Sequence, residues 1–150
     1  GVQTCALPIW IIVSGHGNFA SGLLSTLKLI AGEQENVIGI DFIDGQGSAE
    51  LKNNIKETIN NFGDDIFILT DLAGGSPFTN SVLLKEELIN KNIEVISGTN
   101  IPMLLEVVLG RDNVELKDLI ETAKEAGANG INIFKLKEKQ LDDENLNDGI

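Results

Sequence analysis

The stretch IFILTDLAGGSPF, residues 66–78, joins a short apolar segment to a polar segment that is rich in glycine. Residues 66–69 are apolar and Thr70 is β-branched, so we predict a buried strand over residues 66–70. Asp71 stands at the end of this strand, and a helix is predicted from Pro77 to about residue 90. A buried strand followed by a short loop and a helix is typical of proteins with a parallel sheet.

Similar units precede and follow this stretch. Further strands are predicted over residues 10–13, 37–42, 93–97 and 131–136. Further helices are predicted over about residues 19–32, 48–62, 100–109 and 114–126, with a break of the last helix at residues 127–130. Short connections and right-handed crossovers favour a doubly wound, mainly parallel, flavodoxin-like α/β fold with the strand order 2-1-3-4.

The composition of the chain changes near both ends. The first nine residues, GVQTCALPI, read like a translated sequencing adapter and lack an initiator Met, so we interpret residues 1–9 as a non-native segment. Residues 10–136 are expected to form one domain. Residues 137–150 are expected to be a polar, flexible tail.

Charge and cysteine content narrow the classes of function. The net charge of -12 disfavours binding to nucleic acid, because the phosphates would be repelled. This charge suits a partner with a basic docking face, and solubility alone would also explain it. No apolar run approaches the roughly 18 residues of a membrane span, and one cysteine cannot form an internal disulfide. We therefore expect a cytoplasmic protein.

His16, the only histidine, follows the first predicted strand in a turn between Gly15 and Gly17. Ligands of such folds gather at the carboxyl ends of the strands. If the first and third strands are neighbours, Asp71 lies in the same crevice and can bind one imidazole nitrogen, which leaves the other free as a nucleophile. The alternatives are a structural histidine and an aspartate that caps a loop. No second histidine and no usable cysteine accompany His16, so no metal site is expected. No cofactor is expected either.

Two further loops are predicted to reach the same crevice. Gly74, Gly75 and Ser76 precede a helix whose N–H groups could hold phosphoryl oxygens, with Gly17 allowing close approach from the first loop. Capping of the helix by Ser76 would explain the motif equally well. In the loop after the fourth strand, Thr99 and Asn100 could line the rim, or Asn100 could cap the next helix.

Four motifs together resemble one protein family. SGHG (14–17), GEQENV (32–37), DLAGGSPF (71–78) and SGTNIPMLLE (97–106) are similar to the IIA subunit of the mannose family (mannose, fructose, sorbose and N-acetylgalactosamine type) of the phosphoenolpyruvate-dependent sugar phosphotransferase system. The resemblance covers about residues 10–136.

The resemblance implies a phosphohistidine carrier in sugar uptake. The phosphocarrier HPr would phosphorylate His16, and the group would pass to a IIB subunit and then to a sugar at the membrane subunits IIC and IID. Asp71 would orient the histidine, and Ser76 would lie near the phosphoryl group. The family also implies a homodimer in which residues 131–136 are exchanged between subunits.

Three alternatives share this fold class. A receiver domain phosphorylated on Asp71 would need acidic metal ligands after the first strand, where Ser14 and His16 stand instead. The phosphotransfer subunit of dihydroxyacetone kinase shares the fold and the histidine, but the GGSPF and GTNIPM segments favour the sugar-transport branch. A regulatory domain from a transcription factor of the same system is the third alternative.

Overall fold

The computed structural model describes residues 8–137 and contains four strands and five helices in that range. Residues 1–7 of the expected non-native segment, and residues 138–150 of the expected tail, lie outside this range. The strands are β1 (Ile9–His16), β2 (Val37–Phe42), β3 (Asp65–Thr70) and β4 (Asn92–Ile96). The helices are α1 (Phe19–Ala31), α2 (Ser48–Asn60), α3 (Ser76–Glu87), α4 (Ile101–Gly110) and α5 (Leu116–Asn129).

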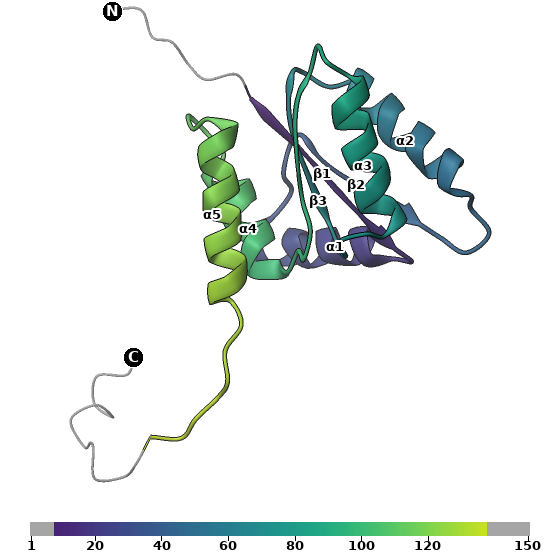
Figure 1. Ribbon diagram of the computed structural model, residues 1–150. Helices are drawn as coiled ribbons and strands as arrows, with labels where there is room; N and C mark the ends of the chain where they lie inside the picture. The colour runs from purple at the N-terminus through teal and green to yellow at the C-terminus, as the bar shows by residue number, and fades with distance from the viewer. Residues whose placement is uncertain (1–7, 138–150) are drawn as a thin grey trace, which may run out of the picture.

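The four strands form one sheet in the order β2-β1-β3-β4, and every neighbouring pair is parallel. Helices α1, α4 and α5 pack against one face, while α2 and α3 pack against the other (Figure 1). The predicted flavodoxin-like fold class and strand order are confirmed. Within the described range, no helix is both long enough and apolar enough to span a membrane.

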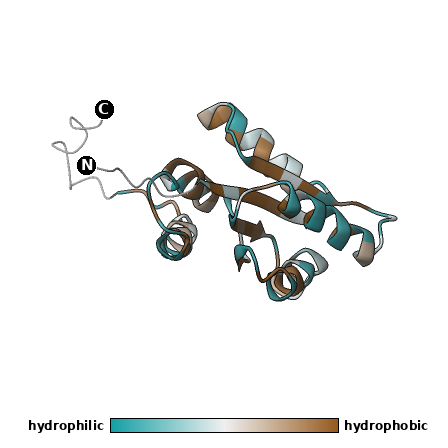
Figure 2. Ribbon diagram, turned by 90° about the horizontal axis from the view of Figure 1, so that it is seen from above, coloured by the Kyte–Doolittle hydropathy of each residue, from teal (hydrophilic) through white to brown (hydrophobic). Residues whose placement is uncertain are grey.

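Alternating side chains of the central strands fill two separate cores. Ile11 and Val13 of β1 face the helices α1, α4 and α5, whereas Ile12 between them faces α2 and α3. All three side chains are fully buried. Figure 2 shows that the strands are hydrophobic along most of their length, whereas the helices also carry hydrophilic residues. Burial on both faces explains why the central strands β1 and β3 are mostly apolar.

Strand β1 is longer than the sequence suggests. The turn predicted at residues 14–17 is wrong for its first three residues, because β1 continues to His16 in register with Phe42 of β2. The Ser14 hydroxyl donates to the Ile40 carbonyl at 2.9 Å, and the Gly17 N–H donates to the Phe42 carbonyl at 2.7 Å. Cross-strand bonds therefore hold the backbone around His16.

Helix α5 continues through the glycine at which a break was predicted. Gly127 lies within α5, and its carbonyl accepts a hydrogen bond from Asn100 Nδ2 at 2.9 Å. A Cβ at position 127 would lie 2.9 Å from Met103 Cε, so this glycine allows α4 and α5 to approach closely. The predicted hinge at residue 127 is therefore wrong, and the helix ends at Asn129.

The predicted fifth strand is not formed within the single chain. Residues 131–137 have no regular secondary structure and lead away from the body of the protein (Figure 1). Ile131, Ile133, Phe134 and Leu136 are exposed, with Phe134 at 83%. A strand needs a hydrogen-bonding neighbour, and this segment has none among the residues described. Exchange of the segment between two subunits remains a prediction.

Candidate functional site

His16 and Asp71 meet at the carboxyl ends of the neighbouring strands β1 and β3. His16 Nδ1 lies 2.7 Å from Asp71 Oδ2, and the His16 backbone N–H donates to the same oxygen at 2.9 Å. The other carboxylate oxygen, Oδ1, accepts the Leu72 N–H at 2.8 Å. The His16 side chain is 48% exposed and that of Asp71 only 15%. The carboxylate is thus fixed in place while the imidazole stays open to solvent.

Hydrogen bonds keep Asp71 ionised. Partial burial raises the pKa of its carboxyl, but the bonds donated by the His16 backbone, the His16 ring and the Leu72 N–H outweigh it and hold the pKa below the usual value. A carboxylate can only accept at Nδ1, so the proton of the neutral imidazole lies on Nδ1. The lone pair at Nε2 is then available for attack on an electrophile.

Phe42 and Gly75 are further neighbours of the imidazole. The Phe42 ring lies 5.8 Å from the imidazole between centroids, with the planes tilted by 57°. A Cβ built on Gly75 would lie 2.6 Å from His16 Cε1 and 3.3 Å from Nε2. The edge of the ring that carries Nε2 therefore faces the backbone at the start of α3.

The start of α3 offers N–H groups to an anion. Gly75 is the N-cap in an extended conformation, and Ser76 is the first helical residue, so the predicted N-cap role of Ser76 is wrong by one position. No side chain caps this helix. The first N–H groups of a helix lack intrahelical acceptors and can bind an anion. At α1, by contrast, Asp41 Oδ1 already accepts the Ser21 N–H at 3.0 Å.

The two remaining glycines of the predicted site shape the backbone. Gly17 has φ 59° and Gly74 has φ 84°, a region that favours glycine. The Gly17 N–H is already bonded to the Phe42 carbonyl, so it is not available to a ligand. Gly74 lies in the tight loop in which the Gly75 N–H donates to the Leu72 carbonyl at 3.2 Å. Both glycines set the turns that present His16 and the start of α3.

Thr99 and Asn100 use their polar atoms inside the fold. Thr99 is 7% exposed, and its hydroxyl donates to the Thr70 carbonyl at 2.8 Å. Asn100 caps α4 by accepting the Met103 N–H at 3.0 Å, which confirms the capping interpretation. The structure does not bring their polar groups to the imidazole. Phe42, which does reach it, was missed, although the end of the second strand in a 2-1-3-4 order must lie beside the end of the first.

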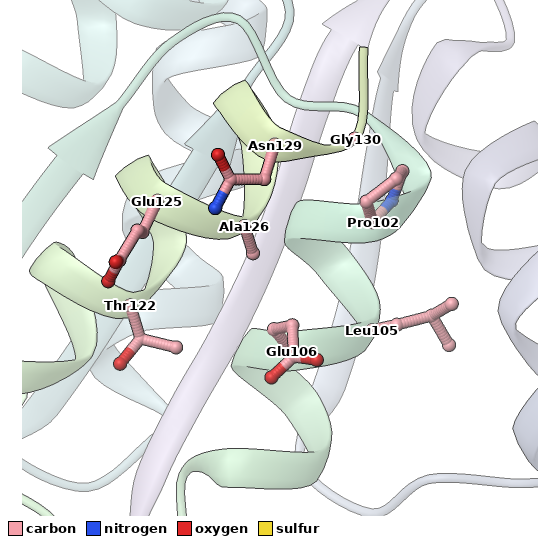
Figure 3. A pocket seen from close by; sticks show the side chains of 8 residues that line it. All are labelled: Pro102, Leu105, Glu106, Thr122, Glu125, Ala126, Asn129 and Gly130. Atoms are coloured by element: carbon pink, nitrogen blue, oxygen red, sulfur yellow. The ribbon is translucent and has the colours of Figure 1, made fainter. Parts of the chain in front are cut away.

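A groove of about 550 Å³ lies elsewhere, between α4 and α5 (Figure 3). Its walls include Pro102 and Leu105 from α4 and Ala126 from α5, and Glu106 and Glu125 project from the two helices. None of the residues that line it belongs to the cluster around His16. The candidate site lies at the carboxyl ends of the two central strands, and its exposed imidazole is accessible to another macromolecule.

Comparison with known proteins identifies relatives among components of the phosphotransferase system (PTS). A family model, EIIA-man, described as the PTS system fructose IIA component, matches residues 10–124. The PTS system mannose-specific EIIAB component of Escherichia coli K12 is 35% identical over 134 residues, which are 87% of this chain and 41% of that protein. The PTS system fructose-specific EIIA component of Bacillus subtilis is 30% identical over 118 residues, 77% of this chain and 80% of that protein.

A solved structure agrees with these matches. The crystal structure of phosphotransferase system component EIIA from Streptococcus agalactiae is similar with a TM-score of 0.80 and 43% identity. The alignment covers 83% of this chain and 96% of that one. This chain spans less than half the length of the mannose-specific relative.

Proposed function

This chain belongs to the EIIA-man family of phosphotransferase-system components, and from that premise we propose that His16 carries a phosphoryl group during sugar uptake. The donor is the phosphocarrier HPr, and the acceptor is a IIB subunit or domain that passes the group towards the membrane subunits IIC and IID. The relatives named for mannose and fructose favour this role over that of a dihydroxyacetone kinase subunit or a regulatory domain. The observation that carries the proposal is the 2.7 Å contact between His16 Nδ1 and Asp71 Oδ2.

The transfer step needs no general base, because Nε2 attacks through its lone pair while the proton stays on Nδ1. The Nε2 lone pair of His16 attacks the phosphorus of the phosphorylated donor, and the bond from phosphorus to the donor breaks with its electron pair returning to the donor. The His16 ring becomes cationic as the new N–P bond forms, and Asp71 stabilises this charge through Nδ1. The same interaction serves the reverse step, in which the phosphoryl group leaves Nε2 for the IIB acceptor.

The start of α3 supports the proposal from the phosphoryl side. Nε2 lies next to Gly75, so a phosphoryl group on this nitrogen would be close to the first N–H groups of α3 and to Ser76. These groups and the positive end of the helix dipole stabilise phosphoryl oxygens. Phosphoryl transfer depends mainly on positioning and electrostatics, and Asp71 and the start of α3 contribute to both.

Incubation with phosphoenolpyruvate, enzyme I and HPr tests the proposal. The wild-type chain should take up phosphate that is labile in acid and stable in base. His16→Asn is the sharpest variant, because its side-chain amide can still donate to Asp71 but has no nucleophilic nitrogen. It should fold normally and take up no such phosphate. Uptake by this variant equal to that of the wild type would contradict the assignment of His16.

We also propose that the chain forms a homodimer through residues 131–136. Strand β4 pairs with β3 on one side, and no strand among the described residues covers its other edge. An open edge and an exposed segment with Ile131, Ile133 and Phe134 each gain from pairing with a second copy. Truncation after Gly130 leaves α5 complete and should give monomers or aggregates by light scattering. An unchanged dimer would contradict the exchange.

A further inference from the structure

Two helices on the same face of the sheet, α2 and α3, begin after a glycine in the same backbone conformation. Gly47 before α2 has φ -85° and ψ 157°, and Gly75 before α3 has φ -78° and ψ 165°. Any residue adopts these angles, and Ser, Asp or Asn would cap a helix better than glycine does. Backbone conformation therefore does not explain why position 75 is a glycine.

The space around the two glycines differs completely. A Cβ at Gly47 would meet nothing within 4 Å. A Cβ at Gly75 would lie 2.6 Å from His16 Cε1 and 3.3 Å from Nε2, against roughly 3.5–4.0 Å for two carbon atoms at optimal separation. The next atom that this Cβ would meet, the Leu72 carbonyl oxygen, lies at 3.5 Å, which is ordinary contact. The conflict at position 75 thus involves the imidazole alone.

The His16 side chain is 48% exposed, so the imidazole could move away from such a Cβ, but only by disturbing its contact with Asp71. Its Nδ1 lies 2.7 Å from Asp71 Oδ2, and the Phe42 ring is a further neighbour. A shift by the several tenths of an ångström or more that the Cβ requires would lengthen or bend the hydrogen bond to Asp71, which weakens steeply with poor geometry. The ring can hold its present position only because residue 75 has no side chain.

We propose that Gly75 is a positioning residue for His16: its missing side chain leaves the space in which the imidazole keeps Nδ1 on Asp71 and presents Nε2 to the start of α3. This role rests on the proposed function of His16 as phosphoryl acceptor. It differs from a contact between the Gly75 backbone and the phosphoryl group, because it acts on the ring before any phosphoryl group arrives.

Gly75→Ala and Gly47→Ala form a matched pair that tests this role. Both substitutions put alanine at a helix N-cap with extended geometry, so any loss of helix stability from poorer capping should be similar in the two variants. Phosphotransfer from phospho-HPr should slow by about 10-fold or more in Gly75→Ala, because small misplacements of a reacting group are costly, and should be unchanged in Gly47→Ala. Equal rates in the two variants would overturn the proposal.

The state of the imidazole gives a readout that does not depend on phosphotransfer. His16 is the only histidine, so the ¹⁵N signals of the ring are assigned without ambiguity. In wild type and Gly47→Ala, the neutral ring should carry its proton on Nδ1. In Gly75→Ala the population should shift towards the Nε2–H tautomer, as the bond to Asp71 is lost. An unshifted tautomer in Gly75→Ala would overturn the proposal even if transfer were slow.

If Gly75→Ala folds poorly, the same two glycine substitutions can be compared in a variant that lacks the imidazole. In His16→Ala the imidazole is gone, so adding Gly75→Ala should cost no more stability than adding Gly47→Ala. A larger cost at position 75 in that background would show a conflict with something other than the ring and would overturn the proposal. If the wild-type chain itself accepted no phosphoryl group, the proposed function would fail, while the tautomer comparison would still decide the role of Gly75.

Discussion

The two ends of the β-sheet use polar side chains in opposite ways. At the amino end, Arg111 donates to the Ile9 and Asn36 carbonyls at 3.3 and 3.2 Å. Lys91 in the same region donates to the Phe62 and Gly63 carbonyls at 3.0 Å each. At the carboxyl end, the carboxylate of Asp71 is directed at the backbone and ring of His16.

The interactions at the amino end of the sheet therefore contribute to stability, and those at the carboxyl end contribute to reactivity. At the amino end, cationic side chains bind backbone carbonyls and close the loops before the strands. The carboxyl end concentrates its interactions on one imidazole and leaves Nε2 free. Substitutions at the amino end should therefore change the free energy of unfolding, and those at the carboxyl end should change phosphotransfer.

The largest effect is expected for Asp71→Asn. The amide keeps the shape of the carboxylate but loses its charge and can satisfy either tautomer of His16. Transfer from phospho-HPr should slow by about 10²-fold or more, because the variant loses tautomer control and the charge that stabilises the cationic ring. Rapid-quench kinetics measures the rate, and circular dichroism should show an unchanged fold. If Asp71→Asn transferred the phosphoryl group at the wild-type rate, Asp71 would act only as a cap for the loop.

Arg111→Met tests the amino end of the sheet. The substitution removes the hydrogen bonds that the guanidinium donates to the Ile9, Glu35 and Asn36 carbonyls, which should cost about 1–3 kcal/mol in the free energy of unfolding. The matched control is Lys28→Met, which removes only an exposed ion pair with Glu33 and should cost little. Urea denaturation measures both variants, and each should transfer phosphate at the wild-type rate when folded. An Arg111→Met variant with unchanged unfolding free energy but slow phosphotransfer would contradict the proposed difference between the two ends.

A smaller effect is expected for Ser76→Ala. The hydroxyl is lost, but the N–H groups at the start of α3 remain and still attract phosphoryl oxygens, so the rate should fall by less than about 10-fold. The same rapid-quench assay ranks it against Asp71→Asn. If Ser76→Ala were the slower variant, the hydroxyl and not the carboxylate would carry the chemistry.

The smallest effect concerns acid stability. Because the pKa of Asp71 is lowered by folding, its contribution to stability is complete above the usual aspartate pKa of about 4 and is lost as pH falls through the folded value. The difference in unfolding free energy between wild type and Asp71→Asn should therefore shrink in acid. Denaturation at several pH values measures this, and a difference that grows in acid would contradict the direction of the shift.

Local patterns of apolar and turn residues predicted the strands and helices, and the rules for crossovers in doubly wound folds gave the strand order. That order, with the rule for strand ends, predicted the pair His16 and Asp71. The sequence did not predict that β1 continues to His16, since glycines at positions 15 and 17 suggest a turn unless the pairing with β2 is known. Gly127 was likewise misread, because only the packing of α4 against α5 shows why a glycine is needed there.

The role of Gly75 could not be predicted from the sequence. In GGSP the glycine is consistent with a loop, a cap or a close approach, and only the distance to His16 Cε1 distinguishes them. The same holds for Phe42, whose place beside the imidazole depends on the register between β1 and β2. Sequence patterns predict which elements meet, whereas the fit between side chains requires coordinates.

The position of the phosphoryl group on the imidazole tests the central claim most directly. Phosphorylation of ¹⁵N-labelled protein by phospho-HPr, followed by ³¹P and ¹⁵N NMR of the single histidine, identifies the phosphorylated nitrogen. Because Asp71 occupies Nδ1, the phosphoryl group should be bonded to Nε2. A phosphoryl group on Nδ1 would contradict the account, since that nitrogen would have to leave Asp71 in order to react.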